Sequence, residues 1–139
     1  MLDPEGFLNL YWRATLNGEL VLLSPRPPDR PFMDGEAHPF QLSSKRAGGS
    51  GRRKLCAVDW DGDGRLDLLI NSENANVLRQ TERRRDKWVM KDLGKLADKD
   101  IASHDVSPTT VDWNGDGVPD FLGGAEDGRF YYLQNPRSP

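Results

Sequence analysis

A nine-residue loop rich in aspartate holds the residues of this chain that are best suited to chemistry. It runs from Asp59 to Asp67 as DWDGDGRLD, which places carboxylates at loop positions 1, 3, 5 and 9 and glycines at positions 4 and 6. Calcium takes about six to eight oxygen ligands in a flexible geometry, whereas magnesium demands a stricter octahedron. A loop that offers several carboxylates, a backbone carbonyl and room for water therefore favours calcium.

The same loop occurs a second time. The second copy, DWNGDGVPD, runs from Asp112 to Asp120, begins 53 residues after the first and aligns with it without a gap. Its third position is Asn114, so this copy carries one negative charge fewer. A gapless recurrence of this kind indicates two copies of one structural unit.

The residues around the loops exclude the best-known calcium loops. An EF-hand needs a bidentate glutamate at position 12, where this chain has Ile70 in the first copy and Gly123 in the second. A dockerin-type loop also needs an acid there, and the nonapeptide β-helix repeat has a different glycine spacing. Both loops instead lie between short β-type runs, which predicts a loop that joins two strands. The runs are residues 55–58 and 68–70 around the first loop and 109–111 and 121–122 around the second.

A strand, a calcium loop with aspartate at position 9 and a second strand together resemble the FG-GAP/VCBS repeat family. The resemblance is specific over residues 53–78 and 107–135. Members of that family form blades of β-propellers, as in the heads of integrin α-subunits and in many secreted bacterial proteins, and bind calcium through this loop. The resemblance implies an all-β fold, a partial β-propeller of about two and a half blades of antiparallel strands.

The resemblance also implies which residues hold the ions. Four side chains and one backbone carbonyl would serve each of two Ca²⁺ sites, and Asn114 would make the second site weaker. The implied side-chain ligands are Asp59, Asp61, Asp63 and Asp67 in the first loop and Asp112, Asn114, Asp116 and Asp120 in the second. The implied backbone carbonyls are those of Arg65 and Val118.

The repeat predicts how the chain is organised. The expected segments are the end of a truncated blade (1–25), a connecting loop rich in proline and glycine (26–52), a blade with the first calcium loop (53–106) and a last blade with the second (107–139). We expect the C-terminal blades of a larger protein, with a natural small protein that begins at Met1 as the alternative. Within the first segment, Asn17-Gly18 predicts a hairpin turn. Exposed strand edges invite pairing with another chain, so we also expect self-association through open blade edges.

The composition fits one turn-rich β domain. The 139 residues are 36% hydrophobic and include 14 glycines and 10 prolines, with a mean hydropathy of −0.71. No apolar run approaches the length of about 18 residues that a membrane helix needs. The net charge is −3, which argues against nucleic acid as a partner. A single cysteine, Cys56, excludes an internal disulfide.

The remaining polar residues form no recognisable catalytic set. His38 and His104 lack a second ligand at metal-binding spacing, and no serine lies in the pattern G-x-S-x-G. The basic stretch 45–54 lacks the Walker A order and is interpreted as a solvated loop or as one that meets an acidic glycan. Trp60 and Trp113, at loop position 2, are expected to pack between blades, with a sugar-stacking platform as the alternative.

These observations favour a fragment of a binding or scaffold protein, with structural calcium and a carbohydrate or protein ligand. The alternative is a fragment of a calcium-dependent enzyme similar to the polysaccharide lyases, because some of those enzymes resemble this chain in having propeller blades with calcium loops. A calcium sensor is disfavoured, because strands around the loops offer no hinged helix pair. The affinity typical of extracellular calcium modules, on the order of 10⁻⁴–10⁻³ M, predicts a secreted or periplasmic parent protein.

Overall fold

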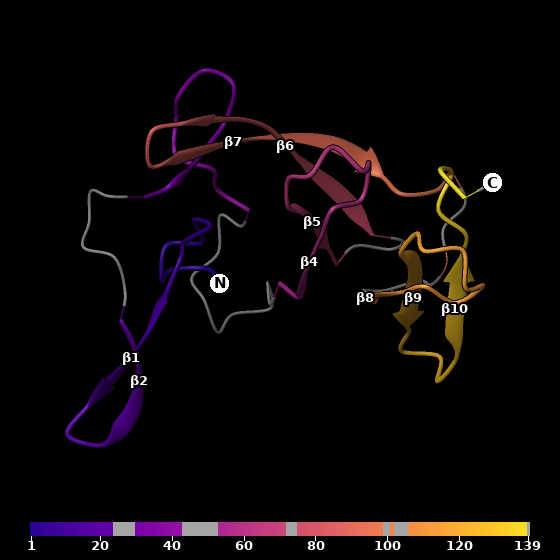
Figure 1. Ribbon diagram of the computed structural model, residues 1–139, viewed down its shortest axis with the longest axis horizontal. Coiled ribbons are helices and arrows are strands. Elements are labelled where there is room, and N and C mark those ends of the chain that lie inside the picture. Colours follow the sequence, from indigo (N-terminus) through magenta and orange to yellow (C-terminus); the bar gives the residue numbers. More distant parts are fainter. Residues whose placement is uncertain (24–29, 43–52, 72–74, 99–100, 102–105, 139) are drawn as a thin grey trace. The chain divides into compact units, whose positions relative to one another are not determined.

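The computed structural model describes residues 1–23, 30–42, 53–71, 75–98, 101 and 106–138. These residues are all-β, as the sequence predicts, and none of them forms a helix that could cross a membrane (Figure 1). The described strands are β1 (Trp12–Leu16), β2 (Glu19–Leu23), β3 (Phe32–Met33), β4 (Leu55–Val58), β5 (Asp67–Ile70), β6 (Asn76–Arg84), β7 (Lys87–Lys95), β8 (Ser107–Val111), β9 (Asp120–Gly124) and β10 (Phe130–Leu133).

The chain divides into two compact units. The first comprises Met1–Arg53 and Thr81–Met90, and the second comprises Lys54–Gln80 and Lys91–Pro139. The long β6–β7 hairpin therefore contributes its tip to the first unit and its base to the second. Both aspartate loops belong to the second unit.

In the first unit, β1 and β2 form an antiparallel hairpin. Its turn is Asn17-Gly18, and both residues have positive φ, at 51° and 81°. Two positive φ values are typical of the type I′ turn, whose twist matches that of the flanking strands. The predicted turn is therefore confirmed.

A short strand lies inside the segment that the sequence indicates as a connecting loop. Strand β3 pairs in parallel with β7 through Phe32 and Trp88 and through Met33 and Val89. The Phe32 ring stacks on the Trp88 ring, with 5.4 Å between their centroids. A parallel contact of only two residues, next to Pro31, leaves no alternating pattern in the sequence, so periodicity could not predict it. Residues 24–29 and 43–52, which make up most of the predicted connection, lie outside the described residues.

The second unit contains both strand–loop–strand hairpins. β4 pairs antiparallel with β5, with Val58 opposite Asp67, and β8 pairs antiparallel with β9, with Val111 opposite Asp120. Each loop thus connects two neighbouring strands, as predicted, and its position 9 is the first residue of the outgoing strand. β6 continues the first hairpin beyond β5, and β10 continues the second beyond β9.

The core of the second unit draws residues from both hairpins. Its buried members are Val58, Trp60, Leu69, Ala75, Val77, Val106 and Phe121. Phe121 is completely buried, and a Cβ built on Gly123 would lie 2.6 Å from the Phe121 ring and 2.5 Å from Val106. Such distances leave no room for a side chain at position 123. Glycine there lets β9 lie close against the core.

The two tryptophans at loop position 2 lie in opposite environments. Trp60 is buried in the core of the second unit, whereas the side chain of Trp113 is 65% exposed and contacts the Tyr132 ring at 6.3 Å. Packing is thus the role of Trp60. Trp113, which has the same residue type and loop position, remains open to solvent among the residues that the structure describes.

Candidate metal centre

Each loop is held by its own first aspartate. The Asp59 carboxylate accepts hydrogen bonds from the backbone N–H groups of Gly62, at 2.8 Å, and Gly64, at 3.1 Å. Both glycines have positive φ, at 76° and 82°, a conformation that side chains disfavour. The loop glycines therefore allow the backbone to curl around one carboxylate. In the second loop Asp112 accepts the equivalent bonds from Gly115 and Gly117.

The side chains at loop positions 3 and 5 also accept hydrogen bonds from the backbone of the loop. In the first loop Asp61 accepts the N–H of Asp63 at 3.1 Å, and Asp63 accepts the N–H of Arg65 at 2.9 Å. Each bond joins a side chain to the backbone two residues on, which is the turn that aspartate and asparagine favour. The second loop repeats both bonds: Asn114 accepts the N–H of Asp116, and Asp116 accepts that of Val118.

The aspartates at position 9 are buried and tie each loop to a later part of the chain. Asp67 is 1% exposed and accepts the N–H groups of Trp60, at 3.1 Å, and Gln80, at 2.8 Å. Asp120 accepts the N–H of Asn135 at 2.8 Å and the hydroxyl of Tyr132 at 3.1 Å. These carboxylates fix where each outgoing strand begins.

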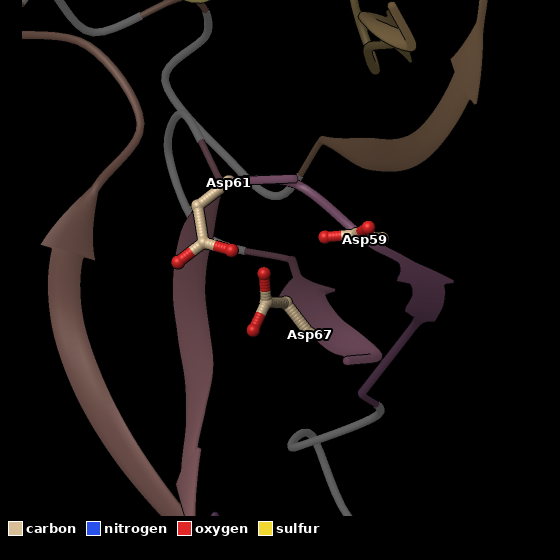
Figure 2. A group of neighbouring side chains, drawn as sticks. All are labelled: Asp59, Asp61 and Asp67. Carbon is tan, nitrogen blue, oxygen red and sulfur yellow. The ribbon is translucent and has the colours of Figure 1, made fainter. Parts of the chain in front are cut away.

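Three of the predicted ligands of the first loop come together. Asp59, Asp61 and Asp67 each offer a carboxylate oxygen, and these oxygens all lie within 4.8 Å of one another. Figure 2 shows one oxygen of Asp61 directed toward the carboxylate of Asp67, with Asp59 facing the same space. An all-oxygen set of this kind suits a hard cation such as Ca²⁺ and not a soft one.

Asp63, the fourth predicted side-chain ligand, lies outside this group. Its carboxylate pairs with the guanidinium groups of Arg65, at 3.1 Å, and Arg79, at 3.4 Å. Desolvation would raise the pKa of Asp63, but the N–H of Arg65 and the two guanidinium charges outweigh it, so the pKa lies below its ordinary value. Asp63 is thus held ionised by cations of the protein itself.

Asp67 has the opposite electrostatic environment. Burial raises the pKa of its carboxyl above the ordinary value, and the nearby charge of Asp61 adds to that rise, against the effect of its backbone N–H donors. A raised pKa means that the ionised form is disfavoured there. A cation placed among Asp59, Asp61 and Asp67 would remove this cost.

The second loop has the same backbone but a different charge arrangement. Within the described part of the chain, no comparable group of three acidic side chains forms among Asp112, Asp116 and Asp120. Asn114 donates its amide N–H to Asp116 at 2.8 Å, which turns one potential ligand toward another. Among the described residues, three acidic side chains therefore come together in the first loop and not in the second.

Sequence reasoning missed three residues that contact the first loop. Asn135 donates its side-chain N–H to the carbonyl of Trp60 at 3.1 Å, and Arg137 donates its Nε–H to the same carbonyl at 2.9 Å. Arg79 places its Nε 2.5 Å from an oxygen of Asp61. The signal for Arg79 was its position as the single charged residue in the run 76–80, directly after the first hairpin.

Comparison with protein families gives one result for this chain. Residues 59–123 match the family described as FG-GAP-like repeat, a segment that begins at the first residue of the first loop and includes the whole second loop. Comparisons with curated proteins and with solved structures found no match.

Proposed function

Because residues 59–123 match the family described as FG-GAP-like repeat, we propose that the chain is a calcium-stabilised β-propeller fragment of a binding or scaffold protein. Calcium is structural in this proposal. The partner bound by the whole protein is a carbohydrate or another protein, and the parent is secreted or periplasmic.

The observation that supports calcium most directly is the cluster of Asp59, Asp61 and Asp67. Three carboxylates whose oxygens lie within 4.8 Å repel one another when all are ionised. Burial raises the pKa of Asp67 above its ordinary value, and the nearby charge of Asp61 adds to that rise. A divalent cation converts the repulsion into attraction, and the oxygen donors fit Ca²⁺.

A structural role follows from where the cluster lies. The first loop connects β4 to β5, which contribute Val58 and Leu69 to the core, and Trp60 inside the loop belongs to the same core. Fixing the loop therefore fixes three core residues. A ligand that binds only the folded state stabilises it by about 2.7 kcal/mol at a hundredfold excess over its Kd.

The number of bound ions tests this proposal. Equilibrium dialysis against millimolar CaCl₂ should load about two ions per chain, the tighter one in the first loop. Asp59→Asn should remove the tighter ion and leave the weaker one, because it loses the charge and one of the two oxygens that accept the N–H groups of Gly62 and Gly64. Asp112→Asn should remove only the weaker ion. Loss of the same ion in both variants, or no bound ion in the wild type, would refute the assignment.

A further inference from the structure

The Arg79 guanidinium lies beside the predicted ion site but comes from a strand outside the first loop. Arg79 lies on β6, and its Nε is 2.5 Å from Oδ2 of Asp61 while its Nη2 is 3.4 Å from Oδ2 of Asp63. One planar cation therefore bridges the carboxylates at loop positions 3 and 5. Arginine is suited to this, because its rigid fork can serve two acceptors at once.

The contact between Arg79 and Asp61 joins two buried atoms of side chains that are 42% and 29% exposed. Both Arg79 Nε and Asp61 Oδ2 are buried atoms, and neither has a well-aligned hydrogen-bond partner among the residues that the structure describes. Their close approach is therefore chiefly a charge contact without a good hydrogen bond.

The neighbouring loop gives an internal comparison. Arg79 lies on the strand that follows β5, and the corresponding strand of the second hairpin, β10, reads FYYL from Phe130 to Leu133 without a basic residue. Tyr132 on that strand donates its hydroxyl to Asp120. The loop with three clustered carboxylates thus has a cation on the adjacent strand. The strand beside the second loop has a neutral hydroxyl instead, and the cation near that loop is Arg137, which lies outside the strand and acts on Asp116.

We propose that Arg79 is a resident counter-cation that replaces calcium at the first loop when calcium is scarce and competes with it when calcium is present. This inference rests on the proposed calcium site. Without metal, the guanidinium offsets the charge of Asp61 and Asp63 and keeps the loop folded. When calcium binds, the Arg79 guanidinium no longer pairs with Asp61. Repulsion between the guanidinium and the calcium ion then weakens the binding of calcium. Arg79 therefore sets the calcium concentration at which the first loop becomes occupied.

The test is Arg79→Gln, which removes the charge and keeps a polar side chain of similar reach. We expect calcium to bind the first loop about tenfold more tightly by calorimetric titration, since a unit charge a few ångströms from a divalent ion in a partly exposed site has an effect of this order. In chelator, the same variant should melt at a lower temperature than the wild type. The two effects have opposite signs, which a purely structural role would not produce.

Arg84→Gln is the matched control. Arg84 lies on the same strand, five residues after Arg79, and forms an ion pair with Glu82 at 2.8 Å. This variant should change neither the calcium affinity nor the melting temperature in chelator.

The possible results separate this inference from the proposed function. If the wild type binds calcium and Arg79→Gln binds it equally or more weakly, the counter-cation role is refuted and the calcium site stands. If the wild type binds no calcium, the proposed function fails and the competition fails with it. An unchanged melting temperature of Arg79→Gln in chelator would refute the role of Arg79 in the metal-free loop.

Discussion

Phe121→Ala is expected to destabilise the chain by about 3–5 kcal/mol, the usual cost of removing a large buried aromatic side chain. Phe121 is completely buried and contacts the core of the second unit beside Val106 and Gly123. Gly123 offers no side chain that could move into the space, so the cavity would not collapse readily. Urea unfolding followed by tryptophan fluorescence measures the effect, since Trp60 belongs to the same core.

Phe130→Ala is the control for this prediction. Phe130 lies on the neighbouring strand β10 with 80% of its surface exposed. The same substitution there should change the free energy of unfolding by less than about 0.5 kcal/mol. Equal losses in the two variants would show that Phe121 is not in the core.

Asp67→Ala is expected to lower stability by about 2–5 kcal/mol in chelator. The substitution leaves the N–H groups of Trp60 and Gln80 buried without their acceptor, and each such orphan costs about 1–3 kcal/mol. Asp67→Asn keeps only one of the two oxygens that accept these N–H groups, so it orphans one donor instead of two, and it removes a charge that burial disfavours. Its loss in chelator should therefore be smaller than that of Asp67→Ala. Both variants should lose the calcium response of the first loop.

Chemical unfolding in chelator and in calcium separates the two roles of Asp67. Asp86→Ala, at the exposed tip of the β6–β7 hairpin, should leave both curves unchanged and serves as the control. A calcium response that persists in Asp67→Asn would remove Asp67 from the ligand set. An Asp67→Ala variant as stable as the wild type would contradict the buried hydrogen bonds.

The local parts of the structure could be predicted because their causes lie within a few residues. Aspartates and glycines at fixed spacing specify both loops, and the apolar runs beside them specify β4, β5, β8 and β9. Asn17-Gly18 likewise specifies its turn. In each case the residues that determine the backbone conformation lie within one short segment.

The remaining parts depend on contacts between distant residues. Asn135 contacts the carbonyl of Trp60 from 75 positions away, and no periodicity indicates such a pair. Trp60 and Trp113 are identical in type and loop position, yet only Trp60 is buried. Burial there is decided by what packs against the hairpin, which local sequence does not encode. The same holds for Arg79, whose role depends on the strand pairing that places it beside the loop.

The most direct test of structural calcium is thermal unfolding of the chain in chelator, in millimolar calcium and in millimolar magnesium. A single domain of this size gains about 2–4 °C or more for each kcal/mol, so we predict a rise of several degrees in calcium and little change in magnesium. The rise should be smaller in Asp59→Asn, which leaves only the weaker site of the second loop. A melting temperature that is the same in all three solutions would contradict the account, because the clustered carboxylates would then be folded without any need for the ion.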